Sequence, residues 1–490
     1  MLLDVLMQPE LGEAPRSTPL PQVIQGGMGV GISSWQLART VSRAGQLGVV
    51  SGTAIDSLLV RRLQDGDVGG DLRRAMDHFP IPGVAARVLA RHFLPDGRGE
   101  NVPYKMLSMY RLGASREREL VTVLAAFVEV FLAKEGHDGL VGINLLTKVQ
   151  LPNPAALYGA MLAGVGYVLM GAGIPREIPA LLDALARHHP VALRLEISQP
   201  HEADVPLIRF DPAAFWPDAL PAPLLRPQFL AIVSSHSLAT MLARKASGRV
   251  DGFVLERATA GGHNAPPRGP LQLTEDGQPV YGARDDVDFA ELNALGLPWW
   301  LAGSAGNPAA LADALALGAA GIQVGTLFAF CDESGLAEPL RARTLADATA
   351  DRLEVFTDPR ASPTGYPFKV VRFTDEPDPA VRERVCDLGY LRTAYRRPDG
   401  RIGYRCPSEP VAAYVEKGGR EEDTVGRRCL CNALLANTGH AQHRGEGVVE
   451  APLLTSGDDL MIMRQFLQGR ARYSALDVLE YLGCPLPAAR

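Results

Sequence analysis

Two glycine-rich turns, about one helix apart, narrow the possible folds more than any other feature. Leu301-Ala-Gly-Ser-Ala-Gly306 and Gly321-Ile-Gln-Val-Gly-Thr-Leu-Phe328 each contain a short apolar run, and a helical pattern over Pro308–Leu317 separates them. Such turns expose backbone N–H groups without obstruction by Cβ atoms, which is how the last two loops of a (β/α)8 barrel bind phosphate. The pair predicts a phosphate-bearing ligand, whereas either turn alone would suit a tight connection in any α/β protein.

Strand-like apolar runs alternate with helical patterns, which is typical of a mainly parallel sheet. The eight predicted strands are Gln22–Gln25, Leu47–Ser51, Val141–Leu145, Tyr167–Met170, Phe229–Val233, Gly252–Glu256, Trp299–Ala302 and Gly321–Val324. Apolar residues at helical spacing predict outer helices over Ser34–Ala44, Leu120–Lys134, Asn153–Leu162, Ile178–Arg187, Leu238–Ala246 and Pro308–Leu317. The predicted fold class is therefore α/β, a (β/α)8 TIM barrel.

Three segments interrupt or follow this alternation. Val191–Ile197 and Pro206–Phe210 predict an inserted antiparallel hairpin over about 191–212, and the Arg- and Pro-rich segment Asp56–Ser115 predicts a helical insertion that covers the barrel mouth. The barrel pattern ends after Phe328. We therefore expect a barrel over residues 1–330 and a C-terminal lobe of loops and helices over residues 331–490.

Composition narrows the class of protein. Of the 490 residues 47% are hydrophobic, and 49 basic and 55 acidic residues give a net charge of -6 without long single-sign blocks, so nothing predicts a nucleic-acid partner. No apolar run reaches the roughly eighteen residues of a membrane helix, and Met1–Pro21 lacks the pattern of a signal peptide. We expect a soluble, cytoplasmic protein without a membrane partner.

The N-terminal run Val23-Ile-Gln-Gly-Gly-Met-Gly-Val-Gly31 joins the first strand to the first helix, where a Rossmann fold would also place glycines. The spacing Gly27-x-Gly29-x-Gly31 lacks the wider final gap of that fingerprint, and the second strand ends in Val-Ser-Gly-Thr instead of an acidic residue. The barrel is therefore favoured over the dinucleotide fold. In a barrel this loop would lie beside a planar ligand or its linker.

The segment Leu255-Glu-Arg-Ala-Thr-Ala-Gly-Gly-His-Asn264 follows the sixth predicted strand. Paired glycines let the backbone pass close to a planar ligand, and His263 then lies on the rim where barrel enzymes carry out their chemistry. A histidine suits proton exchange near neutral pH. The alternative is an ordinary histidine in a glycine turn.

Taken together the motifs resemble a family. Ile24-Gln-Gly-Gly-Met-Gly29, Gly142-Ile-Asn144, Ala260-Gly-Gly-His263, Ala302-Gly-Ser-Ala-Gly306 and Val324-Gly-Thr326 resemble, in order, the signatures of the nitronate monooxygenase (2-nitropropane dioxygenase) family of FMN-dependent barrels. That family is similar to the flavin-dependent enoyl-acyl-carrier-protein reductases, including the trans-acting enoyl reductases of polyunsaturated fatty acid and polyketide synthases. The resemblance covers roughly Pro21–Phe328. A serine stands at Ser304 where the family often has glycine.

The resemblance implies FMN as cofactor and His263 as the catalytic residue. The implied cofactor-binding residues are Gly27, Met28, Gly29, Asn144, Gly262, Gly303, Ser304, Gly306, Gln323, Gly325 and Thr326. The predicted function is oxidation of an alkyl nitronate with O2 to a carbonyl compound and nitrite. One alternative is an enoyl-thioester reductase that uses NAD(P)H and acts with an acyl carrier protein; another is a non-catalytic partner subunit of a biosynthetic assembly.

Four of the six cysteines fall in one C-terminal stretch. Cys386, Cys406, Cys429 and Cys431 could supply soft ligands to zinc or to an iron–sulfur cluster. No C-x-x-C pair is present, and buried free cysteines also behave as ordinary small apolar residues. A metal site and ordinary packing are therefore both open.

Overall fold

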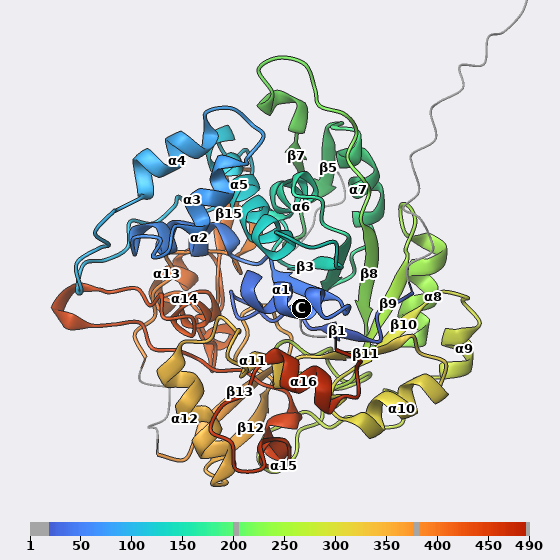
Figure 1. The fold of residues 1–490 in the computed structure, drawn as a ribbon. Helices are drawn as coiled ribbons and strands as arrows, with labels where there is room; N and C mark the ends of the chain where they lie inside the picture. The colour runs from blue at the N-terminus through green and yellow to red at the C-terminus, as the bar shows by residue number, and fades with distance from the viewer. Residues whose placement is uncertain (1–18, 199–204, 376–381, 487–490) are drawn as a thin grey trace, which may run out of the picture.

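Eight parallel strands form a closed barrel in the computed structural model, which describes residues 19–198, 205–375 and 382–486 (Figure 1). The order around the sheet is β1-β11-β10-β9-β8-β4-β3-β2. The strands are β1 (Val23–Gln25), β2 (Gly48–Ser51), β3 (Val141–Leu146), β4 (Tyr167–Gly171), β8 (Gln228–Val233), β9 (Gly252–Glu256), β10 (Trp299–Ala302) and β11 (Gly321–Val324). The barrel closes between β1 and β2, where Gln25 N donates to Leu47 O (2.9 Å). The predicted (β/α)8 TIM barrel and all eight predicted strands are confirmed.

The predicted outer helices are present with small shifts at their ends. They are α1 (Trp35–Arg43), α5 (Arg116–Lys134), α6 (Asn153–Leu162), α7 (Ile178–Ala186), α8 (His236–Lys245) and α10 (Pro308–Ala316), with α9 (Phe289–Asn293) in addition. Side chains fix several starts: Ser34, Ser235 and Asn307 each accept a hydrogen bond from a backbone N–H of the first turn.

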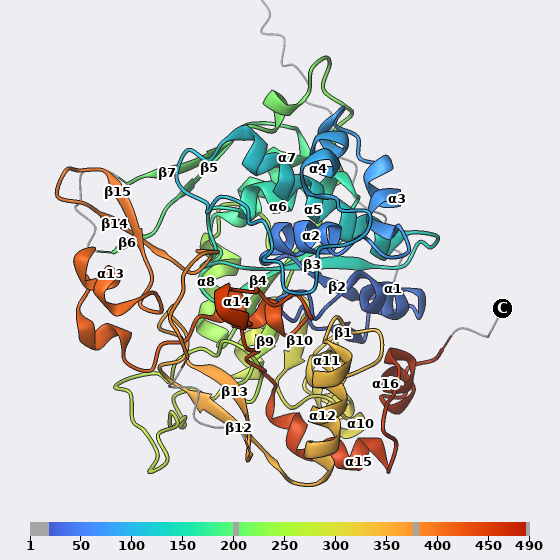
Figure 2. The same ribbon diagram turned by 90° about the vertical axis from the view of Figure 1, so that its left-hand side faces the viewer.

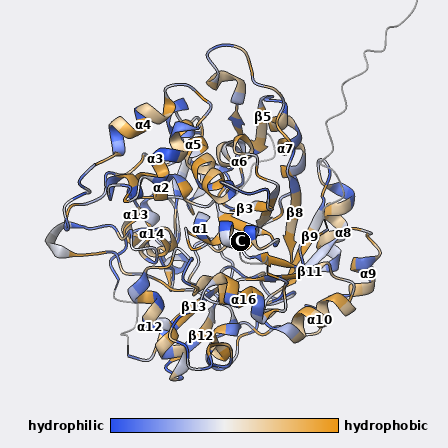
Figure 3. Cartoon of the chain, viewed as in Figure 1, coloured by the Kyte–Doolittle hydropathy of each residue, from blue (hydrophilic) through white to orange (hydrophobic). Residues whose placement is uncertain are grey.

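Alternation along the strands separates two apolar layers. One cluster is formed by every second strand residue, among them Ile24, Leu169, Leu230, Val254 and Trp300, and fills the barrel interior. The residues between them belong to the larger cluster that packs against the helices. Figure 3 shows this as hydrophobic colouring through β3 and β8, with mixed colouring on the helices around them.

The segment predicted as a helical insertion contains α2 (Ile55–Gln64), α3 (Asp71–Asp77) and α4 (Val84–His92). It contacts both the barrel and the C-terminal third of the chain. Asp56 pairs with Arg118 of α5 (2.6 Å), and Ser57 Oγ lies 2.7 Å from the Tyr390 hydroxyl. The insertion is therefore held between the two parts.

The predicted hairpin is also present. Strands β5 (Val191–Arg194) and β7 (Leu207–Phe210) pair antiparallel, while residues 199–204 lie outside the described residues. Between them, β6 (Ile197–Ser198) pairs with β14 (Thr393–Arg396), which also pairs with β15 (Ile402–Arg405). The barrel insertion thus shares a sheet with the C-terminal part of the chain.

The chain after the barrel forms short elements that pack back onto it (Figure 2). These are α11 (Thr326–Ala329), α12 (Glu338–Thr349), β12 (Leu353–Asp358), β13 (Phe368–Phe373), α13 (Val411–Glu416), α14 (Leu430–Ala436), the 3-10 helix η5 (Asp458–Ile462), α15 (Met463–Leu467) and α16 (Ala475–Tyr481). The Tyr473 hydroxyl donates to Leu327 O (2.7 Å), which fixes the last segment beside α11. The division at residue 330 stays a prediction. Across the described ranges, no helix is both long and apolar enough to span a bilayer.

Candidate functional site

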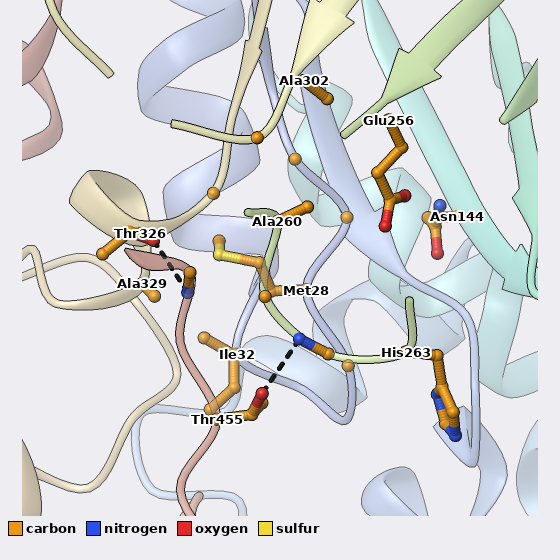
Figure 4. Close-up of a pocket in the computed structure, with 18 of the residues that line it drawn as sticks. Met28, Ile32, Asn144, Glu256, Ala260, His263, Ala302, Thr326, Ala329 and Thr455 are labelled. Atoms are coloured by element: carbon orange, nitrogen blue, oxygen red, sulfur yellow. Dashed lines mark hydrogen bonds between the residues drawn. The ribbon is translucent and has the colours of Figure 1, made fainter. Parts of the chain in front are cut away.

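A cavity lies at the carboxyl ends of the barrel strands (Figure 4). The predicted site residues that line it are Gly27, Met28, Gly29, Asn144, Gly262, His263, Gly303, Ser304, Gln323, Gly325 and Thr326. Gly306 is absent from the lining but follows Ala305, which belongs to it. The sequence motifs, far apart along the chain, therefore meet around one space, as expected for loops at the same face of a barrel.

Buried polar side chains hold the β1 loop. The Ser33 hydroxyl donates to Gly26 O (2.7 Å) and accepts from Met28 N (2.8 Å), while Gln25 Nε2 donates to Ser33 Oγ (2.8 Å). Gly27 is required sterically, because a Cβ there would lie 2.0 Å from Asn144 Cβ. The loop thus lies against Asn144 of β3.

The two glycines before His263 are needed for different reasons. A Cβ on Gly261 would lie 2.7 Å from Gly457 N, so the close contact with the C-terminal part of the chain requires this glycine. Gly262 has φ +78° with open space around it, and its requirement is conformational. The close approach predicted for a planar ligand is therefore, at Gly261, an approach to the chain itself.

His263 lines the cavity, but its surroundings change its expected role. Its Nε2 lies 2.7 Å from Ser362 Oγ, and its ring packs edge-on against Phe368 with centroids 4.8 Å apart. Burial lowers the pKa of His263 to about 4. With this pKa the ring is neutral at pH 7, whereas the sequence analysis expected a histidine that titrates near neutral pH; the catalytic role of His263 stays a prediction.

Glu256 was missed by the sequence analysis. It ends β9, and Figure 4 shows its carboxyl in the cavity beside Asn144. Burial raises the pKa of Glu256 to about 8, and no described residue forms a hydrogen bond or ion pair with it. The carboxyl is therefore mostly protonated at pH 7. The sequence does show a single acidic residue at the end of an apolar strand, which could have identified Glu256 as a candidate. Its raised pKa could be inferred only from the tertiary structure, because it arises from burial.

The two glycine turns face the cavity, and the first of them has an unusual backbone conformation. Gly303 (φ +89°) and Ser304 (φ +48°) are both in the left-handed region, which explains why a glycine would be easier than a serine at position 304. A Cβ on Gly325 would have Met28 Sδ, 3.8 Å away, as its nearest neighbour, so the backbone there borders open space. Gln323 Oε1 is buried without a hydrogen-bond partner.

The C-terminal part of the chain completes the wall of the cavity, which the sequence analysis did not anticipate. Thr455 Oγ1 accepts from Gly262 N (2.9 Å), and Gly457 N donates to Thr326 Oγ1 (3.1 Å), as the dashed lines in Figure 4 show. Asp459 also lines the cavity. The loop after β1, the loops after β9 to β11 and the C-terminal part of the chain therefore all contribute to the wall of the cavity.

The four C-terminal cysteines border a second, small cavity together. Burial raises the pKa of Cys429 to about 11, and a hydrogen bond with Cys406, together with burial, raises the pKa of Cys386. All four are free cysteines. In the described part of the chain no group of three or more His, Cys, Asp or Glu side chains could hold a metal ion as it is arranged. The structure thus brings the four predicted ligands to one cavity, and a metal site there stays a prediction.

Comparison with known proteins supports the resemblance over part of the chain. Residues 219–372, which include His263 and both glycine turns, match the nitronate monooxygenase family model, so the predicted resemblance is confirmed for this segment. No curated protein sequence matches the chain significantly.

Similar solved structures are remote in sequence. FabK from Thermotoga maritima is 16% identical (94% of this chain, 91% of that chain, TM-score 0.44), and nitroalkane oxidase from Streptomyces ansochromogenes is 17% identical (95% of each chain, TM-score 0.43). The enoyl reductase domain of MlnA from the macrolactin biosynthesis cluster of Bacillus amyloliquefaciens is 12% identical (94% and 92%, TM-score 0.44). At these identities and scores none of the three assigns an activity to this chain.

Proposed function

We propose that the chain is an FMN-dependent oxidoreductase. Support comes from the barrel, from the cavity at its carboxyl-terminal face, and from the family match across the segment that carries both glycine turns. A phosphate would bind to backbone N–H groups of these turns, and at Gly325 the backbone borders open space.

The residues present fit this cofactor on two observations. The open space at Gly325 is a cradle that a larger side chain would fill, and the unpartnered Gln323 Oε1 offers an acceptor to a ligand N–H or O–H. Bound flavin would supply the electron transfer to or from the substrate, which no amino-acid side chain supplies here. The predicted roles of Gly27, Met28, Gly29 and Asn144 as its contacts remain proposals.

The protonated carboxyl group of Glu256 favours enoyl-thioester reduction. Reduction of an enoyl thioester by NAD(P)H takes up one proton per turnover, and a carboxyl that is protonated at pH 7 inside the cavity can donate it to the α-carbon. We therefore propose an enoyl-thioester reductase, with Glu256 as proton donor and neutral His263 as a hydrogen-bonding group that orients the substrate. NAD(P)H as reductant and an acyl carrier protein as partner remain part of this proposal.

Nitronate oxidation is the second candidate, and the family match over residues 219–372 favours it. An alkyl nitronate enters as an anion and its carbon needs no proton donor. It would bind between Asn144 and His263, and the protonated Glu256 would then serve as a hydrogen-bond donor to the nitronate oxygens. A non-catalytic role for the chain would leave this protonated acid unused.

One experiment separates the candidates. The purified protein should release FMN on denaturation, and its flavin absorbance should bleach with NAD(P)H. Recovery of the absorbance on anaerobic addition of a crotonyl thioester supports the reductase, whereas bleaching by an alkyl nitronate followed by nitrite release in air supports the oxidase. Released FAD, or no flavin after reconstitution, contradicts the FMN proposal itself.

A further inference from the structure

A short segment of the C-terminal part of the chain enters the barrel mouth. Residues 454–459 lie between the loop after β9 and the loop after β11. Asp458 N donates to Thr259 O (3.1 Å), and Val371 N donates to Leu454 O (2.9 Å). The segment is therefore bonded on both sides and has a defined position beside the predicted phosphate site.

Asp459 uses this position to contact the first glycine turn. Gly306 N donates to Asp459 Oδ2 (3.4 Å), and the Ser304 side chain hydrogen-bonds the same carboxyl group. Asp459 is only 8% exposed. Ser304 and Gly306 are two of the residues predicted to bind the phosphate, so the carboxyl group of Asp459 contacts groups that a phosphate would use.

The described residues that line the cavity offer no positive charge that would separate Asp459 from a bound phosphate. Asp458 is adjacent but pairs with Lys369 (2.7 Å), and Arg257 exerts an attractive charge on Asp459. Among the described residues that line the cavity there is no lysine or arginine. A bound phosphate would therefore meet an ionised Asp459 without a cation between them.

We propose that Asp459 is an internal competitor for the cofactor phosphate, which binds fully only when this carboxyl is protonated or displaced from Ser304 and Gly306. The inference rests on the proposed FMN cofactor. Affinity for FMN should fall as pH rises and Asp459 ionises. The pKa of Asp459 is already raised by burial, against the hydrogen bonds from Gly306 and Ser304, and a neighbouring phosphate raises it further.

The test measures binding of FMN to the flavin-free full chain by flavin fluorescence between pH 5.5 and 8.5. Asp459→Asn keeps an oxygen that can accept from Gly306 but removes the charge, and it should tighten FMN binding by about tenfold at pH 8. The gain should shrink as pH falls through the pKa of Asp459, which burial raises above its ordinary value. The ratio of the two dissociation constants at each pH reports the charge of Asp459, which repels the phosphate more strongly once the phosphate becomes a dianion near pH 6.

Two controls accompany the measurement. Riboflavin, which has no phosphate, should bind both proteins equally. Asp313→Asn changes the net charge by the same amount at an exposed position of α10 and should leave FMN binding unchanged. Weaker FMN binding by Asp459→Asn, or the same pH dependence as the wild type, overturns the inference while leaving the cofactor proposal intact. If neither protein binds FMN at any pH, both the inference and the cofactor proposal are overturned.

Discussion

Replacement of Glu256 by glutamine tests the proposed proton donor directly. With a pKa of about 8, the carboxyl is about 90% protonated at pH 7, whereas an ordinary glutamate would be protonated in less than about 1% of molecules. Burial thus raises the fraction of competent acid by more than about a hundredfold. Glu256→Gln keeps the shape but cannot give up a proton, so kcat for enoyl-thioester reduction should fall by about 10²- to 10⁴-fold.

The pH dependence provides the sign of the effect. Wild-type turnover should be level below about pH 8 and fall above it as Glu256 loses its proton, because the protonated form is the active one. The residual activity of Glu256→Gln should show no such fall. Steady-state rates with NAD(P)H and a crotonyl thioester from pH 6 to 9.5, on protein with equal flavin content, are the assay. Unchanged kcat with an unchanged pH profile would refute the argument.

Glu256→Gln should lower the activity but raise the stability of the folded protein at pH 7. The folded-state pKa of Glu256 is raised from its ordinary value of 4.5, so the folded protein binds the extra proton and stability falls as pH rises from about 4.5 to 8. At pH 7 keeping the group protonated costs about 3 kcal/mol. Glu256→Gln should therefore unfold at higher denaturant concentration at pH 7, with the gain absent at pH 4. Lower stability of the variant at pH 7 would show that the carboxyl makes contacts that offset its burial.

Three further substitutions or measurements test the remaining assignments. Gly325→Asp should fold, since the space beside Gly325 is open and its backbone conformation suits any residue, yet it should lose FMN through charge repulsion; unchanged FMN affinity would place the phosphate elsewhere. His263→Ala should retain FMN and lose turnover by about tenfold to a hundredfold, as expected for a hydrogen-bonding group that orients substrate, with the fall above pH 8 preserved because Glu256 remains; a loss of that pH dependence would return the proton transfer to His263. Elemental analysis of protein purified anaerobically without a metal-binding tag should find neither zinc nor iron at stoichiometric level, because the four C-terminal thiols form no group that could hold an ion as they are arranged; one bound metal per chain would reverse this interpretation.

Sequence patterns were most informative where a residue's environment is set by its neighbours in the chain. Each barrel strand is a short apolar run between turn residues, and its two faces are both buried in a closed parallel barrel, so the run itself identifies the strand. The glycine motifs were informative for a related reason, since each follows a strand and all strands end at the same face. Their convergence on one cavity follows from the fold class.

Properties that depend on contacts between distant segments could not be predicted in the same way. The pKa of Glu256 and of His263 depends on burial by other elements, and a sequence contains the acid or the imidazole but not its dielectric surroundings. Likewise, Gly261 is fixed by Gly457, almost two hundred residues away, and nothing near either glycine in the chain indicates that contact.

The barrel, the positions of its strands along the chain and the turns that face the cavity all follow from residue patterns that can be read without coordinates. The packing of remote segments established the rest: Asp459 contacts the first of those turns, β6 pairs with β14, and four cysteines that are scattered in the sequence border one cavity. This division arises because hydrophobic periodicity encodes local structure and burial. Hydrogen bonds and charges between distant segments depend instead on how the finished elements pack together.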